Sequence, residues 1–282
     1  MLRLVWFVLL VTTLGLGSAG CQHLGADASR GTDAQTRESI AAAATADHRS
    51  EQNIARNAAR HPVETLSFFG LRSDMTVVEV LPGGLWYTEI LAPVLRDEGQ
   101  LVAAGYDPDL PDQPAYRMRG HQNMLDRFAE QEDVFGTVEI AKLTAPVSID
   151  LGLPASADMV LTFRSTHGWV RSEGAQAAYS AFFEVLKPGG VLGVVQHRAG
   201  PETDTTKFNG YVPQETVIAL ALDAGFVLEA KSEINANPRD RANYSGGVWT
   251  LPPSLSGDEA QQDAYVAIGE SDRMTLRFRK PQ

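Results

Sequence analysis

The chain has 282 residues, of which 44% are hydrophobic and 21% are charged, and its formal net charge is −11 at pH 7. This length and composition are ordinary for a globular protein and allow one large α/β domain or two small ones. The acidic balance leaves no electrostatic footprint for nucleic acid, so we expect no nucleic-acid partner.

The first twenty residues have the pattern of a signal peptide. Arg3 supplies a basic start, and the apolar run at 4–16 is too short to span a bilayer comfortably. The sequence SAGC at 18–21 resembles a bacterial lipobox, which implies a lipid on Cys21, the only cysteine. Gln22 replaces the aspartate that favours inner-membrane retention, so the resemblance implies an outer-membrane lipoprotein facing the periplasm. The alternative is an ordinary signal peptide with an accidental cysteine.

The next segment, residues 21–46, is rich in small and polar side chains. It has too little apolar surface to order itself, so we expect a flexible tether, with a helical end at 40–44 left open. A single folded domain should then occupy residues 47–282, with an irregular insert at 235–272 that is rich in Asn, Pro and Gly.

Apolar strands alternate with amphipathic helices along this domain. The expected strands are 76–81, 100–104, 138–143, 159–163, 191–195, 226–230 and 274–278, and the expected helices are 53–60, 62–69, 88–95, 115–131, 176–186 and 213–224. Pro93 lies inside the third helix, which must therefore begin late, near Thr88, or kink. Five apolar strands alternating with helices predict a doubly wound parallel sheet, and the last two strands could pair antiparallel at one edge.

The first strand ends in a Pro-Gly-Gly turn, at Pro82, Gly83 and Gly84, before the third helix. Glycines let a ligand approach the backbone closely, and the free N–H groups at a helix start favour a polar or anionic group. The two adjacent glycines do not form the dinucleotide fingerprint G-x-G-x-x-G. A tight turn with no ligand is an equal alternative.

Three longer motifs add a resemblance to a known family. They are EVLPGGLWYTEILAPVL at 79–95, ADMVLTF followed by RSTHGW at 157–169, and FFEVLKPGGVLGVV at 182–195. Together they resemble the class I S-adenosylmethionine-dependent methyltransferases, over residues 56–281. The resemblance implies a Rossmann-like, doubly wound, seven-stranded sheet that is mostly parallel with an antiparallel last strand. It also implies S-adenosylmethionine as cofactor and a small-molecule methyl acceptor.

The resemblance also implies a set of cofactor-binding residues. They are Glu79, Pro82, Gly83, Gly84, Tyr87 and Asp107. Glu79 would bond loop amides or the cofactor, and Asp107 would accept both ribose hydroxyls, although the spacing of the family pattern falls on Gly105. The alternatives are a structural acid for Glu79, core packing for Trp86 and Tyr87, and a turn acid for Asp107. No acid follows the third strand to meet the adenine amine.

His167 and Arg164 are the candidate catalytic residues. Both follow the fourth expected strand, where open α/β sheets place ligands. A neutral His167 could take a proton from the acceptor, Arg164 could hold a carboxylate or phosphate, and Trp169 could wall the pocket. A structural histidine is the alternative. The pair at 197–198, His-Arg, could face the same cleft, and the insert could be a lid. No metal-ligand spacing occurs.

Three hypotheses remain open from the sequence. The first is a lipid-anchored methyltransferase of unknown acceptor. The second is a non-catalytic small-molecule-binding or scaffold protein that keeps the fold, which avoids the difficulty that S-adenosylmethionine is made in the cytoplasm. The third is another nucleotide-utilising enzyme.

Overall fold

A computed structural model describes residues 31–282 of the chain. The expected signal peptide and Cys21 lie outside this range. Within it, no helix combines the length and the apolar character needed to cross a membrane.

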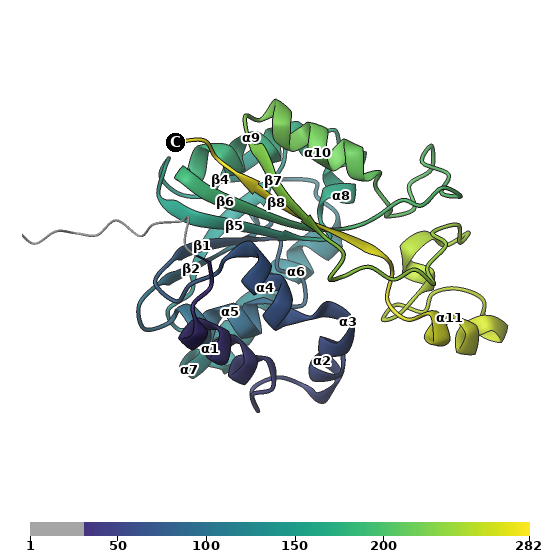
Figure 1. Ribbon diagram of the computed structural model, residues 1–282, viewed down its shortest axis with the longest axis horizontal. Coiled ribbons are helices and arrows are strands. Elements are labelled where there is room, and N and C mark those ends of the chain that lie inside the picture. The colour runs from purple at the N-terminus through teal and green to yellow at the C-terminus, as the bar shows by residue number, and fades with distance from the viewer. Residues whose placement is uncertain (1–30) are drawn as a thin grey trace, which may run out of the picture.

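Eight strands form one sheet in the order β4-β3-β2-β1-β5-β6-β8-β7 (Figure 1). The strands are β1 Thr76–Val80, β2 Gln100–Gly105, β3 Glu139–Thr144, β4 Ser148–Asp150, β5 Ala157–Phe163, β6 Leu186–His197, β7 Val227–Ser232 and β8 Arg273–Arg279. Five neighbouring strands run parallel, in the order β3, β2, β1, β5 and β6. Strand β8 is antiparallel to both of its neighbours, β6 and β7. The predicted Rossmann-like α/β class and the antiparallel final strand are confirmed.

The predicted count of seven strands was wrong, because β4 is an eighth. It pairs antiparallel with β3 at the edge of the sheet. Three partly exposed residues carry no hydrophobic period, so this strand left no signal in the sequence.

Helices cover both faces of the sheet (Figure 1). They are α1 Ala34–Ala44, α2 Glu51–Ala55, α3 Asn57–Arg60, α4 Pro62–Phe69, α5 Thr88–Leu95, α6 Ala115–Glu130, α7 Glu132–Phe135, α8 Thr166–Arg171, α9 Ala175–Val185, α10 Gln214–Asp223 and α11 Gln262–Ile268. The helix α5 begins at Thr88, which is the late start that was one of the two outcomes expected from Pro93, and Pro93 lies inside it. One expected helix at 53–60 is instead the pair α2 and α3, which meet at Arg56.

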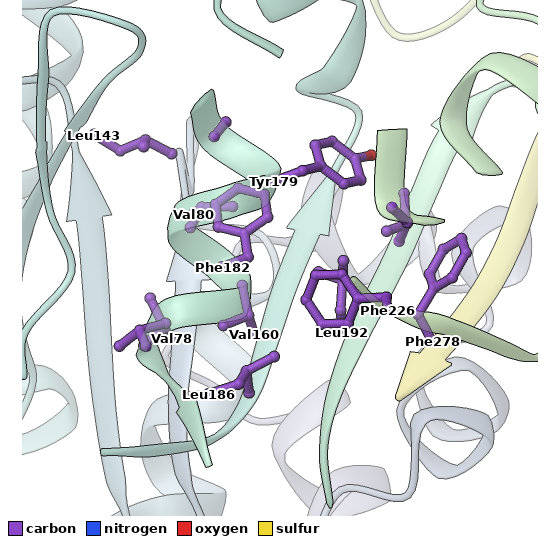
Figure 2. Packing of buried hydrophobic residues seen from close by; sticks show 14 of the residues in the cluster. Val78, Val80, Leu143, Val160, Tyr179, Phe182, Leu186, Leu192, Phe226 and Phe278 are labelled. Atoms are coloured by element: carbon purple, nitrogen blue, oxygen red, sulfur yellow. The ribbon is translucent and has the colours of Figure 1, made fainter. Parts of the chain in front are cut away.

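Two apolar cores lie on the two faces. On one face, Tyr179 and Phe182 of α9 pack over Val160 and Leu192 of the central strands (Figure 2). On the other face, α1, α4 and α5 pack against the same strands. Each fully buried aromatic or aliphatic side chain contributes about 1.5–3 kcal/mol, so these layers hold the strand ends in fixed positions.

The predicted tether was wrong for residues 34–39, which belong to α1, and the helical end left open at 40–44 is part of the same helix. Ile40 is fully buried with Ala43 and Ala44 in the second core. Asp33 caps the helix by accepting a hydrogen bond from the Thr36 amide at 2.7 Å. The alanine-rich composition that suggested a linker also has a high helix propensity, and one isoleucine suffices to dock the helix. Residues 21–30 of the predicted tether lie outside the described range.

Candidate functional site

A cavity of about 660 Å³ lies at the carboxyl ends of the parallel strands. Pro82 follows β1, Tyr106 follows β2, and Thr144 ends β3, while Arg164 and His167 follow β5, and all five line the cavity. The chain proceeds from β1 through β2 to β3 on one side and later places β5 on the other side of β1. The cavity therefore occupies the topological switch point, where doubly wound sheets bind ligands.

The turn after β1 forms one wall of this cavity. Pro82 and Gly83 line it, whereas Gly84 does not. Two leucines that flank the turn, Leu81 and Leu85, have φ angles of 48° and 63°. Such angles are uncommon for residues other than glycine, and strain of this kind clusters at ligand sites. A Cβ atom on Gly83 would meet only the Leu81 carbonyl oxygen, at 3.9 Å, so no side chain lies within 4 Å of that position.

Glu79 lies beneath the turn and does not line the cavity. Its side chain is 1% exposed, and the Thr88 hydroxyl donates a hydrogen bond to it at 2.7 Å. Burial raises the pKa of this carboxyl group to about 7, and the Thr88 bond only partly offsets the effect. Glu79 thus joins β1 to the first residue of α5, which matches the structural alternative for this acid.

Trp86 and Tyr87 lie in the core under the turn. The Trp86 indole N–H donates to the Asn53 carbonyl at 2.9 Å, and the Tyr87 hydroxyl donates to the Arg60 carbonyl at 3.3 Å. The Tyr87 ring stacks on Phe163, with centroids 3.6 Å apart. Tyr87 therefore lies outside the cavity lining, yet the cavity beside the turn is not closed by either aromatic ring.

Asp107 also points away from the cavity. The Ser148 hydroxyl donates to its carboxylate at 2.6 Å, and Lys142 forms an ion pair with it at 3.0 Å. The Ser148 bond, the Asp109 amide and Lys142 together lower the pKa of Asp107 to about 2. Its neighbour Tyr106 lines the cavity instead. Ser148 belongs to the strand that the sequence did not reveal, so this competing partner of Asp107 could not be anticipated.

The structure brings His167 and Arg164 together at the end of β5, as predicted. His167 is in the first turn of α8, and its Nδ1 lies 3.4 Å from the Gln196 amide nitrogen. Burial and the nearby Arg164 charge lower the pKa of His167 to about 4, so its ring is neutral at ordinary pH. A second cavity of about 420 Å³ also includes His167, which therefore lies between two spaces. Trp169 lines the larger one.

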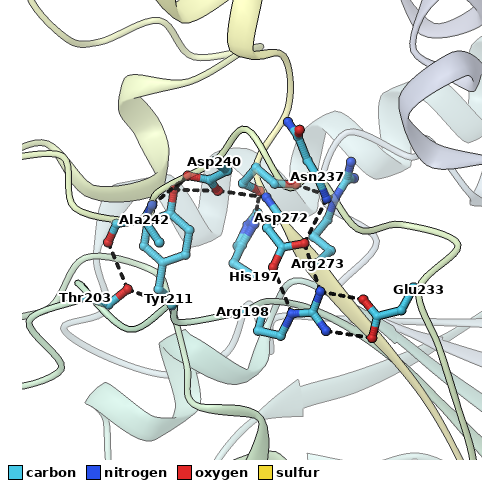
Figure 3. Close-up of polar contacts among 12 residues, drawn as sticks. His197, Arg198, Thr203, Tyr211, Glu233, Asn237, Asp240, Ala242, Asp272 and Arg273 are labelled. Carbon is cyan, nitrogen blue, oxygen red and sulfur yellow. Dashed lines mark hydrogen bonds and ion pairs between the residues drawn. The ribbon is translucent and has the colours of Figure 1, made fainter.

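His197, the last residue of β6, and Arg198, which follows it, have two different environments (Figure 3). His197 is buried with its Nδ1 2.6 Å from the Ser271 hydroxyl, and its ring centroid lies 5.8 Å from that of His167. Arg198 makes paired ion contacts with Asp272 and Glu233. Neither residue lines the larger cavity, and Arg198 fastens the end of β6 to neighbouring loops.

Asp240 of the insert is hydrogen-bonded to residues that lie just before α10 and just before β8 (Figure 3). Its carboxylate accepts hydrogen bonds from the Tyr211 hydroxyl at 3.0 Å and from the Asp272 amide at 2.7 Å. From this anchored insert Trp249 reaches the cavity, where it packs against Phe208 with ring centroids 5.4 Å apart. Phe208 is a wall residue that no sequence pattern indicated, whereas Tyr106 could have been found from its place directly after a strand.

No cluster of three or more potential metal ligands (His, Cys, Asp or Glu) occurs in residues 31–282. Among the described residues, the cavity lining contains no aspartate or glutamate, but it does contain three arginines and two histidines.

No family model matches the chain, and no curated protein matches it. Solved structures do resemble it. The [4+2]-cyclase SpnF has a TM-score of 0.54 and 19% identity, covering 84% of this chain and 86% of the cyclase. A candidate sarcosine dimethylglycine methyltransferase from Galdieria sulphuraria has a TM-score of 0.52 and 12% identity, covering 82% and 88%.

A third neighbour is an S-adenosylmethionine-dependent methyltransferase from Aquifex aeolicus, with 20% identity, 64% and 87% coverage, and a TM-score of 0.47. At these identities the likeness concerns the fold alone. The chain has the Rossmann-like α/β fold found in S-adenosylmethionine-dependent methyltransferases. A cyclase among the neighbours illustrates that one fold hosts different chemistries, so the activity must be argued from the site.

Proposed function

We propose that this protein is an S-adenosylmethionine-dependent methyltransferase that acts on a small-molecule acceptor. The position of the cavity carries the proposal, because the cavity opens beside the Pro82-Gly83 turn at the switch point of the sheet. This is the place where folds of this class bind nucleotide-like ligands. The bound cofactor would supply a methyl group carried on its sulfonium.

The residues present fit parts of this cofactor. Tyr106 and Met124 offer an aromatic and a polarizable surface for the adenine ring. Gly83 lets the backbone come close to the amino acid portion. The ribose hydroxyls find no carboxylate in the lining, because Asp107 is engaged by Ser148 and Lys142. The fit thus rests on shape and on the rings rather than on the family's acid.

The residues that follow β5 would contact the methyl acceptor. His167 is neutral and lies between the two cavities, so it can take a proton from an acceptor hydroxyl or amine. Trp169 and Trp249 give the larger cavity two aromatic walls. Holding both reactants in a closed, oriented site supplies most of the rate enhancement in a transfer of this kind.

A non-catalytic binding protein is the second candidate. The specific observation in its favour is the lack of any acidic side chain in the cavity lining, although the cofactor has a positive sulfonium and an amino group. Such a protein would keep the fold and use the same cavity for another molecule.

Calorimetric titration of S-adenosylmethionine and S-adenosylhomocysteine into the purified protein separates the two candidates. We expect saturable heat with both. The Tyr106→Ala variant should weaken affinity by about tenfold or more, because base–aromatic stacking is worth about 1–3 kcal/mol. Tyr106→Phe keeps the ring and should bind normally. No heat with either compound at millimolar concentration removes the methyltransferase proposal.

We further propose that the protein is an outer-membrane lipoprotein anchored through Cys21. Its support is the lipobox-like sequence at 18–21 and the Gln22 that follows it. Cys21→Ser should release the protein from the membrane fraction of cells that express it. Unchanged membrane association of the variant would refute the anchor.

A further inference from the structure

Positive charge gathers in and behind the cavity, although the chain as a whole is acidic. The lining contains Arg117, Arg164 and Arg171. Two of them pack on aromatic rings: the Arg117 guanidinium lies 5.0 Å from the Tyr106 ring centre, and that of Arg171 lies 4.3 Å from the Phe208 ring centre. These contacts satisfy a guanidinium without an anion.

Arg164 differs from the other two. Within residues 31–282, its guanidinium makes no hydrogen bond, ion pair or cation–π contact, although the charge of Glu270 acts on it from nearby. Its φ angle is 62°, an uncommon conformation for a side chain of this size, and its amide is bonded to the Val195 carbonyl at 2.7 Å. The Arg164 backbone is therefore held in a strained conformation. This conformation fixes the Cα–Cβ direction of the side chain at the cavity wall.

Behind Arg164 lies an arginine cluster, which we define as Arg56, Arg60, Arg164 and Arg273 around the single carboxylate of Glu270. Glu270 forms ion pairs with Arg56 at 2.7 Å, Arg60 at 3.3 Å and Arg273 at 3.1 Å. Four guanidinium groups and one carboxylate leave three positive charges without a counter-charge in the cluster. Arg60 is 1% exposed and its guanidinium lies 4.7 Å from the Trp86 ring centre, but both of its terminal nitrogens, and one of Arg56, lack hydrogen-bond partners.

The excess positive charge shifts the pKa of three titratable groups nearby, Arg60, Glu270 and His197. Burial and then Arg164 lower the pKa of Arg60 to about 8. Burial alone would raise the pKa of Glu270, but Arg273, Arg60 and Arg56 outweigh it and lower the value to about 2. Burial, His167 and Arg164 hold the pKa of His197 well below its usual range. Buried guanidinium donors without acceptors are costly, so this arrangement is poised to accept a negative group.

We propose that the cavity takes a small molecule bearing an oxyanion, a carboxylate or a phosphate, and that Arg164 binds this group with the arginine cluster behind it. The planar fork of a guanidinium matches both oxyanions by two parallel hydrogen bonds. The oxyanion site itself is argued independently of the proposed function. Only the statement that the bound molecule is the methyl acceptor rests on that function. The oxyanion of this molecule would be anchored next to His167, within reach of the neutral ring.

Thermal unfolding of the purified protein tests the site without the cofactor. Potassium phosphate and potassium acetate are compared with potassium chloride at equal ionic strength. We expect at least one oxyanion to raise the Tm in a saturable manner, and the anion that acts identifies phosphate or carboxylate as the preferred group. Stabilisation by neither anion overturns the proposal.

Two arginine variants make the test specific. Arg164→Gln should weaken oxyanion binding by roughly ten- to a hundredfold, because hydrogen bonds to charged groups are stronger than neutral ones. Arg171→Gln removes the same charge from the same cavity but should retain binding, since Arg171 packs on Phe208. Equal losses in both variants would mean diffuse attraction and refute a site at Arg164. If Arg164→Gln does not fold, Arg164→Lys is the alternative variant, because it keeps the positive charge and loses the planar guanidinium. We expect Arg164→Lys to bind the oxyanion at least several-fold more weakly than the parent chain. Normal binding by Arg164→Lys would refute recognition by the guanidinium.

A second readout separates binding from stability. The NMR titration of the His167 ring should shift to higher pH when the active oxyanion is present, because the anion offsets the Arg164 charge. An unmoved titration contradicts the site. If the anion binds and S-adenosylmethionine does not, the methyltransferase proposal fails and the oxyanion site remains; the reverse outcome removes only the oxyanion site.

Discussion

Replacing Glu79 by glutamine should make the protein more stable above neutral pH and leave its stability nearly unchanged in mild acid. The carboxyl group is buried with one hydrogen bond, from Thr88, and its pKa is raised from 4.5 to about 7. The folded protein therefore binds a proton that the unfolded chain has already lost. That contribution to stability is complete below about pH 4.5 and disappears as the pH rises through about 7. A shift of this size corresponds to roughly 3 kcal/mol.

The measurement is urea unfolding of both proteins at several values between about pH 5 and pH 8. The difference between Glu79→Gln and the parent chain isolates this one group, because all other titrations are common to both. It should grow with pH towards roughly 3 kcal/mol and level off near pH 8. Glutamine can still accept the Thr88 bond, so little is lost in acid. A difference that stays constant with pH, or has the opposite sign, would show that Glu79 is ionised in the fold.

Three further perturbations test the site and the core. His167→Ala should reduce methyl transfer by about 10²–10⁴-fold. Because the His167 pKa is lowered to about 4, the activity of the parent protein should be constant from about pH 6 to 8. A loss of activity in acid with a midpoint near pH 6.5 would contradict the neutral ring. Tyr87→Phe should cost about 1 kcal/mol in urea unfolding and leave cofactor affinity unchanged, and a tenfold fall in affinity would restore Tyr87 as a binding residue. Gly193→Ala should cost about 1–3 kcal/mol, since the new Cβ would lie 2.7 Å from Leu161, whereas Gly84→Ala meets nothing within 4 Å and should be neutral.

The central sheet could be predicted because its strands are buried on both faces. Strand β5 is apolar or small at nearly every position, and all seven of its residues are buried, so its sequence stands out from the flanking loops. At the edge this signal disappears. β4 is short and partly exposed, and its place depends on pairing with β3, which is a long-range contact. For the same reason α1 was missed: its burial depends on α4 and α5, not on its own hydrophobic pattern.

The site was predictable in position but not in detail. The rule that ligands gather at the carboxyl ends of parallel strands located Pro82, Gly83, Arg164 and His167 correctly at the cavity. It could not distinguish Tyr106 from Asp107, because adjacent residues after a strand point in different directions. Which of them faces the cavity was decided by Ser148 and Lys142, whose approach depends on tertiary structure.

The charges of the chain and of the cavity have opposite signs, and this contrast bears on which ligands can enter. The net charge of −11 repels anions from the surface as a whole. In physiological salt the Debye length is about 8 Å, so the repulsion from surface charges is largely screened at the mouth of the cavity. Inside the cavity, the attraction between an anion and Arg164 is screened much less. A small anion therefore gains the electrostatic part of its binding energy only when its oxyanion reaches Arg164 at the end of β5. Raising the salt concentration should accordingly weaken capture of a small oxyanion only modestly, and a steep salt dependence would locate its binding on the exposed surface instead.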